Sequence, residues 1–159
     1  IGPVYIKLGA PKMPVLMEED YPFQIGKGVV MEDGDDVTII GTGTLLSKAA
    51  ESAKILREKG IRPRLINMHT IKPLDTELVL SYAQKVKAIV TCENHQVLNG
   101  LGSAVSEYLS EVHPTFVRRV GVLDEFGEVG DLAYLMNRYG MNADNIVKQT
   151  EEVLKLAEK

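Results

Sequence analysis

Short apolar runs rich in β-branched residues alternate with stretches of helical periodicity, and this alternation constrains the fold more than any other feature of the chain. The apolar runs are typical of buried strands. We predict strands at residues 37–40, 64–68, 88–92 and 115–122. The stretches between and after them carry apolar residues three and four positions apart, which is typical of helices. We predict helices at residues 45–59, 76–85 with Asp75 as the cap, 100–111, 131–139 and 144–158.

Strands that alternate with helices imply crossover connections, and such connections place strands in parallel under helices on both faces of the sheet. A further short apolar segment, residues 21–30, precedes the first of these strands. The chain has 159 residues, which suits one ordinary domain. We therefore expect an α/β protein: a three-layer α/β/α sandwich around a mostly parallel sheet of about five strands.

The first 22 residues differ from the rest. The chain begins at Ile1 and enters an apolar β-type run, residues 4–8, with no earlier element to pair with it, as at a cut end. Four of the seven prolines follow or flank this run, and proline removes backbone donors from a sheet. We predict a strand and a linker over residues 1–22 and a compact domain over residues 23–159. The alternative is that the first 30 residues form an N-terminal arm of that same domain.

Composition and charge exclude several classes of protein. Apolar residues make up 45% and charged residues 25% of the chain, as in globular proteins. The 22 acidic and 18 basic residues give a net charge of −4, which disfavours a dedicated nucleic-acid binder and leaves a sugar phosphate as a possible ligand. One cysteine cannot form an intrachain disulfide, and no apolar run has the roughly 18 residues of a membrane span. We expect a cytoplasmic protein.

Two glycine-containing turns precede predicted helices. Residues 41–44, Gly-Thr-Gly-Thr, sit where a dinucleotide fingerprint would, but Leu46 replaces its third glycine and no acidic residue ends the next strand. A tight turn is the favoured interpretation, with amides near Gly43 as a candidate anion site. At residues 99–103, the amide of Gly102 is a second anion candidate. Close packing is favoured there, with Gly100 as a candidate contact for another subunit.

The best local cluster of reactive side chains is Cys92-Glu93-Asn94-His95, at the carboxyl end of a predicted strand. Cys92 with His95 resembles a nucleophile pair, and Glu93 with His95 could exchange protons. Glu93 and His95 are therefore the catalytic candidates. Because Cys92 continues an apolar strand, a buried and inert thiol is the favoured interpretation. With one cysteine and isolated histidines at positions 69 and 113, we expect no metal site.

Two acidic segments remain. Asp33-Gly34-Asp35 resembles half of a metal-diphosphate motif, but acids with glycine before a strand favour a solvated turn. Residues 124–128, Asp-Glu-Phe-Gly-Glu, follow the last predicted strand and offer no nucleophile. We predict that this loop is a contact surface, with Phe126 and Glu128 as the contact candidates.

Taken in order, these segments amount to a family resemblance. Residues 2–8 resemble the last strand of the pyrimidine-binding domain of thiamine-diphosphate enzymes of the transketolase type, and the rest is similar to their C-terminal domain. The matching stretches are FQIGKG at 23–28, DVTIIGTG at 36–43, IKPLD at 71–75, ENH at 93–95, GLGSAV at 100–105 and FGE at 126–128. The set is typical of transketolase, deoxyxylulose-phosphate synthase and the beta subunits of 2-oxoacid dehydrogenases. It is most similar to short, split transketolases.

The resemblance implies a dimeric transferase of two-carbon ketol units between sugar phosphates, as in pentose phosphate metabolism, that uses thiamine diphosphate and Mg²⁺. In that family the cofactor lies between two domains that this chain does not contain. The resemblance therefore implies that the chain binds no cofactor alone, is inactive alone, and needs an N-terminal transketolase section as its partner. It also implies that this domain contributes dimerisation and architecture. His95 matches a recurrent histidine of the family.

One departure from the family concerns the substrate. Relatives commonly carry a phosphate-binding arginine where this chain has Ala10. Phosphate binding would then use Lys7 or Lys12, which act as flexible point charges. Two other classes of function stay open: a free-standing anion- or nucleotide-binding α/β domain that uses the amides near Gly43 or Gly102, and a pure interaction module that dimerises through exposed apolar surface.

Overall fold

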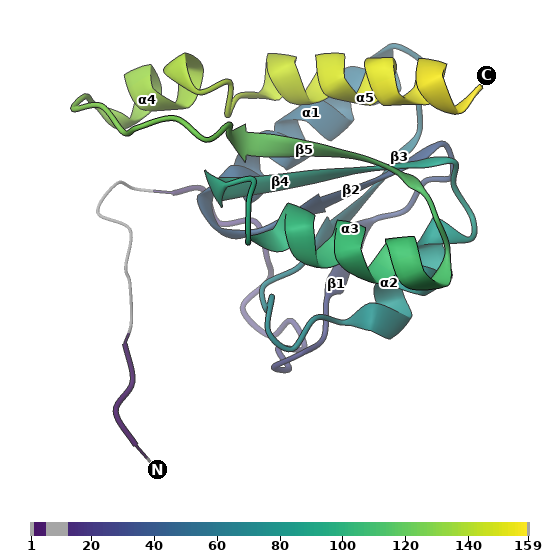
Figure 1. Cartoon of the computed structure of the whole chain (residues 1–159), viewed down its shortest axis with the longest axis horizontal. Coiled ribbons are helices and arrows are strands. Elements are labelled where there is room, and N and C mark those ends of the chain that lie inside the picture. Colours follow the sequence, from purple (N-terminus) through teal and green to yellow (C-terminus); the bar gives the residue numbers. More distant parts are fainter. Residues whose placement is uncertain (1, 6–12, 159) are drawn as a thin grey trace.

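A computed structural model describes residues 2–5 and 13–158 of the chain. Five strands, five α-helices and one short 3₁₀ turn, η1, make up the described part (Figure 1). In chain order they are β1 (Val29–Glu32), β2 (Val37–Gly41), η1 (Gly43–Leu45), α1 (Leu46–Glu58), β3 (Pro63–Asn67), α2 (Thr76–Ala83), β4 (Ala88–Gln96), α3 (Leu101–Val112), β5 (Phe116–Val122), α4 (Leu132–Arg138) and α5 (Ala143–Ala157).

The strands form one sheet in the order β1-β3-β2-β4-β5. Strands β3, β2, β4 and β5 are parallel, and β1 pairs antiparallel with β3 at one edge. Helices α1 and α5 cover one face and α2 and α3 cover the other, and α4 lies beyond the end of β5 on the side of α5 (Figure 1). This confirms the α/β/α sandwich and its mostly parallel, five-stranded sheet. For β1, the sequence indicated only an apolar segment at residues 21–30. That segment ends just after β1 begins at Val29.

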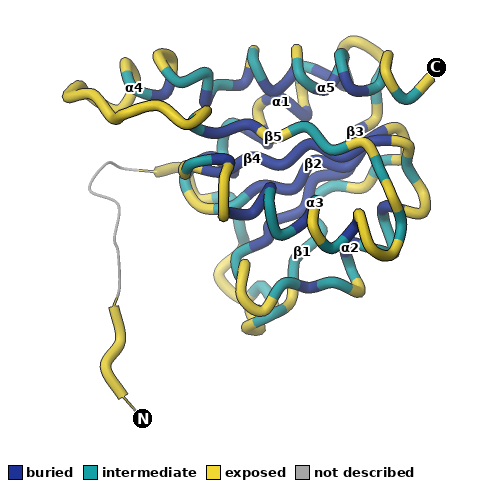
Figure 2. Tube along the Cα trace, in the orientation of Figure 1, coloured by how far each residue is buried: buried dark blue, intermediate teal, exposed yellow. Residues whose placement is uncertain are grey.

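The core lies on both faces of the sheet, which explains the continuous apolar strands (Figure 2). Successive residues alternate between the two faces: Ile39 packs under α1 and α5, and Ile40 packs under α2 and α3. All five residues of β2 and of β3 are buried. A strand with only one covered face would instead show alternating apolar and polar residues.

From residue 37 onward the predicted helices and strands are present, with differences at their ends. Asp75 caps α2 as expected, because its carboxylate accepts a hydrogen bond from the Leu78 amide at 3.2 Å. Strand β4 continues to Gln96, beyond the predicted end at residue 92, with an irregularity in its pairing to β5 between Cys92 and Gln96. Among residues 2–5 and 13–158, no helix combines the length and apolarity needed to cross a bilayer.

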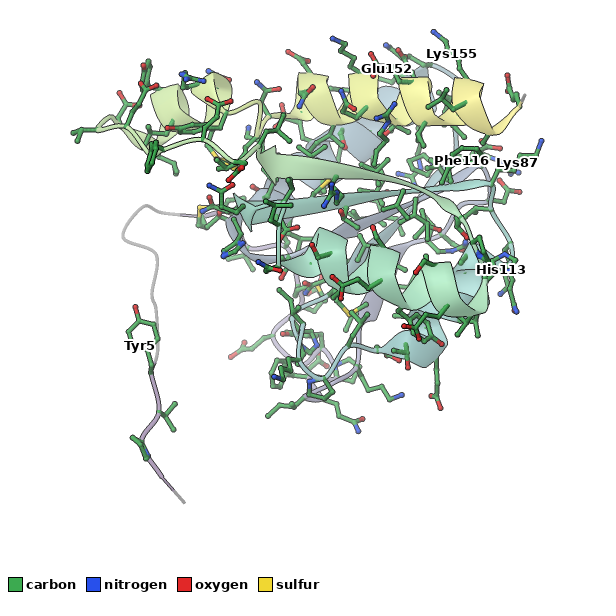
Figure 3. The ribbon with its side chains drawn as sticks, in the orientation of Figure 1. Tyr5, Lys87, His113, Phe116, Glu152 and Lys155 are labelled. Atoms are coloured by element: carbon green, nitrogen blue, oxygen red, sulfur yellow. The ribbon has the colours of Figure 1, made fainter. Side chains whose placement is uncertain are left out.

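The N-terminal residues lie away from the sheet. Val4 and Tyr5 belong to no strand and are 80% and 87% exposed (Figures 2 and 3). The remainder of the predicted strand at 4–8, together with Lys7, Ala10 and Lys12, lies outside the described residues. Residues 13–22 form neither helix nor strand, and Leu16 packs against the edge of the core. The division at residue 22 stays a prediction.

Candidate functional site

A cavity of about 460 Å³ lies at the carboxyl end of the parallel strands. Open α/β sheets commonly place their ligand sites at this edge. The cavity combines the turn after β2, the end of β4, and the loop before α3. Its lining residues are Thr42, Gly43, Thr44, Ile71, Glu93, Asn94, His95, Asn99, Gly100 and Leu132.

The turn after β2 is a tight connection, as the sequence indicated. Gly43 has φ +58°, in the left-handed region that favours glycine. The amide of Thr42 donates to the Cys92 carbonyl at 3.0 Å, which ties the turn to β4. The exposed backbone of Gly43 lines the cavity. Gly43 thus lies in the candidate site. The 3₁₀ turn that begins at Gly43 has only three residues.

Glu93 is the most constrained polar residue of the cavity. Its side chain is 1% exposed, and its two carboxylate oxygens each accept a backbone hydrogen bond at 2.8 Å, from the amides of Leu101 and Gly102. The N-cap residue of α3 is Gly100, which has no side chain to satisfy these amides. Glu93 therefore reaches across from β4 and caps α3, where a negative charge also favours the helix dipole.

The catalytic candidates Glu93 and His95 lie two residues apart in β4 and have different environments. Both oxygens of Glu93 are occupied by helix amides. The exposed His95 instead donates from Nδ1 to the Gln96 carbonyl oxygen at 2.8 Å. No hydrogen bond joins the two side chains within the described part of the chain. Glu93 therefore shapes the wall of the cavity, and His95 presents an imidazole at its rim.

Cys92 is fully buried in the core between the sheet and α1. Burial raises the pKa of its thiol far above the usual range, and the nearby Glu93 carboxylate raises it further. A thiol in this state is a poor nucleophile, because the thiolate is the reactive form. The predicted burial of Cys92 is confirmed, and the inertness of its thiol stays a prediction.

The glycines at the start of α3, Gly100 at the N-cap and Gly102 in the first turn, serve close packing. A Cβ at Gly100 would collide with the carboxylate of Glu93, and a Cβ at Gly102 would lie 2.7 Å from Arg119 Cγ. The amide of Gly102 already donates to Glu93, so it is not available to an external anion while that bond holds. Gly100 is buried beneath the same carboxylate.

Several lining residues were not among the site residues predicted from the sequence. Asn99 has φ +61°, a conformation that asparagine tolerates better than most residues, and its amide donates to Ser103 Oγ at 2.9 Å. Asn99 belongs to the turn that the sequence indicated at residues 99–103, although it was not predicted as a site residue. Ile71 comes from the loop between β3 and α2, and Leu132 is the first residue of α4, so no local pattern could reveal that they lie together. Among the described residues, no lysine or arginine lines the cavity.

The predicted contact loop is organised around Glu128. Its carboxylate accepts hydrogen bonds from the Tyr134 hydroxyl and from Arg138 Nε, each at 2.7 Å, and both lower the pKa of Glu128. The Tyr139 hydroxyl donates to the Phe126 carbonyl at 2.9 Å. These bonds fix the loop while the side chain of Phe126 stays 99% exposed. An ordered loop with an exposed aromatic ring suits a contact surface.

A metal site is absent from the described part of the chain, where no group of three or more histidine, cysteine or acidic residues could hold an ion. Asp33 in the Asp-Gly-Asp segment accepts a hydrogen bond from Arg64 Nε at 2.8 Å and another from the Gly34 amide. These contacts lower the pKa of Asp33, and the hydrogen bond from Arg64 has the largest effect. The segment is a turn, as the sequence favoured.

Comparison with known proteins decides among the classes of function. A family described as "Transketolase, C-terminal domain" matches residues 26–146. The chain belongs to this family. The transketolase C-terminal fold accounts for the sandwich and for the order of the motifs, and the interpretations as a free-standing binding domain or a pure interaction module are not favoured.

Relatives of this transketolase C-terminal domain include subunits of split enzymes. The chain is 44% identical over 152 residues to a 6-deoxy-6-sulfo-D-fructose transketolase subunit, SqwH, of Clostridium sp. (strain MSTE9), covering 96% of the chain and 47% of that protein. It is 36% identical to a putative transketolase C-terminal section of Methanocaldococcus jannaschii, covering 97% of the chain and 49% of that protein.

A solved structure gives the same result for the fold. The structure is described as "Split gene transketolase, inactive beta4 tetramer" and superposes with a TM-score of 0.85 at 41% identity, covering 91% of this chain and 47% of that one. The chain thus spans about half the length of the relatives that it matches.

Proposed function

We propose that this chain is the C-terminal part of a thiamine-diphosphate-dependent enzyme that transfers two-carbon ketol units between sugar phosphates. The observation that carries this proposal is the similarity along 96% of the chain to roughly half of a split transketolase subunit. The complete enzyme would work as a dimer with an N-terminal transketolase section, in the cytoplasm. The cytoplasmic location rests on the single cysteine and the charge composition.

The described residues of this chain do not fit the cofactor. Mg²⁺ with a diphosphate requires several oxygen ligands, and the described residues contain no such group. The acidic side chain in the cavity, Glu93, is fully used by α3. When bound, thiamine diphosphate supplies the electron sink for carbon–carbon bond cleavage. Its site is therefore expected in the other part of the enzyme, and no step through it is assigned to this chain.

The contribution of this chain would be assembly. Phe126 presents an exposed ring on a loop that Glu128 holds in place. Val4 and Tyr5 are also exposed, which suits residues whose partner strand lies in the missing domain. We propose that the loop contacts a second subunit and that the N-terminal residues join the sheet of the pyrimidine-binding domain. Gly100, the other contact candidate, is buried beneath the Glu93 carboxylate, so the exposed loop carries the proposed contact.

The sugar substrate is a finer part of the proposal. Relatives are described as acting on different sugars, for example 6-deoxy-6-sulfo-D-fructose and apulose-4-phosphate. In this chain Ala10 stands where an arginine is common in the family, and Lys7 and Lys12 are the nearby cations. We propose that a phosphorylated ketose is the substrate and that these lysines contribute to phosphate binding. His95 is a further candidate for substrate contact at the cavity rim.

The decisive experiment combines this chain with the upstream polypeptide encoded beside it. Native mass and ketol transfer from a phosphorylated ketose are measured with thiamine diphosphate and Mg²⁺, for each component and for the mixture. Activity in the mixture alone supports the proposal. Assembly without activity would keep the architecture and refute the proposed substrate. No assembly would refute the role as the C-terminal section of a two-part enzyme.

A further inference from the structure

Strand β5 is an edge strand, and a groove of about 330 Å³ runs beside it. We name it the β5–α5 groove. Figure 1 shows α5 lying along β5 on one face of the sheet. The polar side chains that line the groove are Arg118, Arg119, Tyr139, Asn145 and Gln149, and its lining contains no carboxylate. The groove is separate from the cavity at the carboxyl edge, with which it shares no lining residue.

The two arginines differ in their contacts. Arg119 donates from Nη1 to the Val97 carbonyl at 3.0 Å, and its aliphatic part packs beside Gly102 under α3. Side chains alternate between the faces of a strand, so Arg118 lies on the opposite face, with Val120 on the α5 side. Its Nε is buried and has no hydrogen-bond partner among the described residues. Arg118 is therefore a partly buried cation with an unsatisfied donor.

Other groups around the groove do not satisfy Arg118. The Tyr139 hydroxyl and the Asn145 amide nitrogen donate to the carbonyls of Phe126 and Gly140. Figure 3 shows Glu152 on the outer face of α5, pointing away from the sheet, and its carboxylate lies 3.9 Å from Lys148. A buried donor without a partner is unfavourable, and a guanidinium is most strongly satisfied by an oxyanion.

We propose that the β5–α5 groove binds an oxyanion, a carboxylate or phosphate group, through Arg118. The planar guanidinium presents paired donors that match the oxygens of either group. Asn145 lies in the first turn of α5, so the positive end of this 15-residue helix is close to the groove and also favours an anion. The oxyanion comes from a free small molecule or from an aspartate or glutamate of another subunit. This inference does not depend on the proposed ketol transfer.

The test uses the full chain and inorganic phosphate as the probe. Amide and arginine Nε resonances are followed in ¹H–¹⁵N spectra during titration with phosphate, with chloride adjusted to constant ionic strength. We expect saturable shifts that centre on Arg118 and the first half of α5. Arg118→Gln should weaken phosphate binding about ten-fold or more, as expected for loss of a charge-assisted hydrogen bond. The control Arg62→Gln, at an exposed ion pair with Asp35, should leave it unchanged.

A second arm distinguishes the sources of the oxyanion. Sedimentation velocity without phosphate measures association of the chain with itself. If Arg118→Gln abolishes this association and added phosphate also disrupts it, the occupant of the groove is a protein carboxylate. Saturable phosphate binding without such association identifies a free anion. Arg118→Lys serves if the glutamine variant fails to fold, because lysine keeps the charge but loses the fork and should bind phosphate more weakly. Phosphate shifts and association that are both independent of residue 118 would overturn the proposal.

Discussion

Replacement of Glu93 should destabilise the protein far more than replacement of an ordinary surface acid. The carboxylate is 1% exposed and accepts two backbone hydrogen bonds at 2.8 Å from the start of α3. Hydrogen bonds to charged groups contribute about 1.5–3 kcal/mol each. Glu93→Gln keeps the shape of the side chain but turns a donor toward one of the two amides, so we expect a loss of about 2–3 kcal/mol in the free energy of unfolding. Glu93→Ala should lose about 3–5 kcal/mol, because both amides then lack an acceptor.

Urea unfolding followed by circular dichroism measures these differences. The matched control is Glu107→Gln, at an exposed acid of α3, the helix that Glu93 caps. This substitution should change the free energy of unfolding by less than about 0.5 kcal/mol. Gly100→Ala gives an independent check. The new Cβ would collide with the Glu93 carboxylate, so this substitution should also lower the free energy of unfolding. A value for Glu93→Gln within error of the Glu107→Gln control would refute the capping role.

Three further predictions concern separate parts of the molecule. Cys92 should not react with a thiol reagent at pH 8 in the native protein and should react fully in denaturant, because burial raises the pKa of its thiol; rapid native labelling would contradict this. Asp75→Ala should lower the free energy of unfolding by about 1–2 kcal/mol through loss of the α2 cap and of the bond from the Gly28 amide, measured by urea unfolding against Glu77→Ala. Hydrogen bonds from Tyr134 and Arg138 lower the pKa of Glu128 below the usual range of a glutamate. Its contribution to stability is therefore present above the ordinary glutamate pKa and is lost as the pH falls through the lowered value. Tyr134→Phe should raise this pKa in an NMR titration, and an unchanged midpoint would speak against the hydrogen bond.

Local sequence patterns were sufficient for most of the fold. The β-branched runs of β2 and β4 are buried on both faces, so they show as continuous apolar segments. The helices keep the spacing of their buried residues, and Asp75 lies where a cap is expected. Strand β1 was not predicted as a strand, because it is short, only partly buried, and stabilised by antiparallel pairing with β3, which lies far away in the sequence.

The sequence also indicated where the site would lie, since Gly43, Glu93 and His95 all line the cavity at the carboxyl edge. It could not assign their roles. A Glu-x-His segment suggests proton exchange. The hydrogen-bond partners of the Glu93 carboxylate, however, depend on where the fold places the first residues of α3.

By itself, the sequence determined the layers of this protein, its turns and its membership of the transketolase C-terminal family, because these depend on periodicity and on the order of motifs. Only the tertiary structure decided which polar groups are satisfied. Arg118 and Arg119 are adjacent and chemically identical, yet the pleat of β5 sends them to opposite faces. Arg119 donates to the Val97 carbonyl there, whereas Nε of Arg118 has no partner among the described residues. The partners of a side chain come from distant segments, so the fold must bring them together before its role is defined.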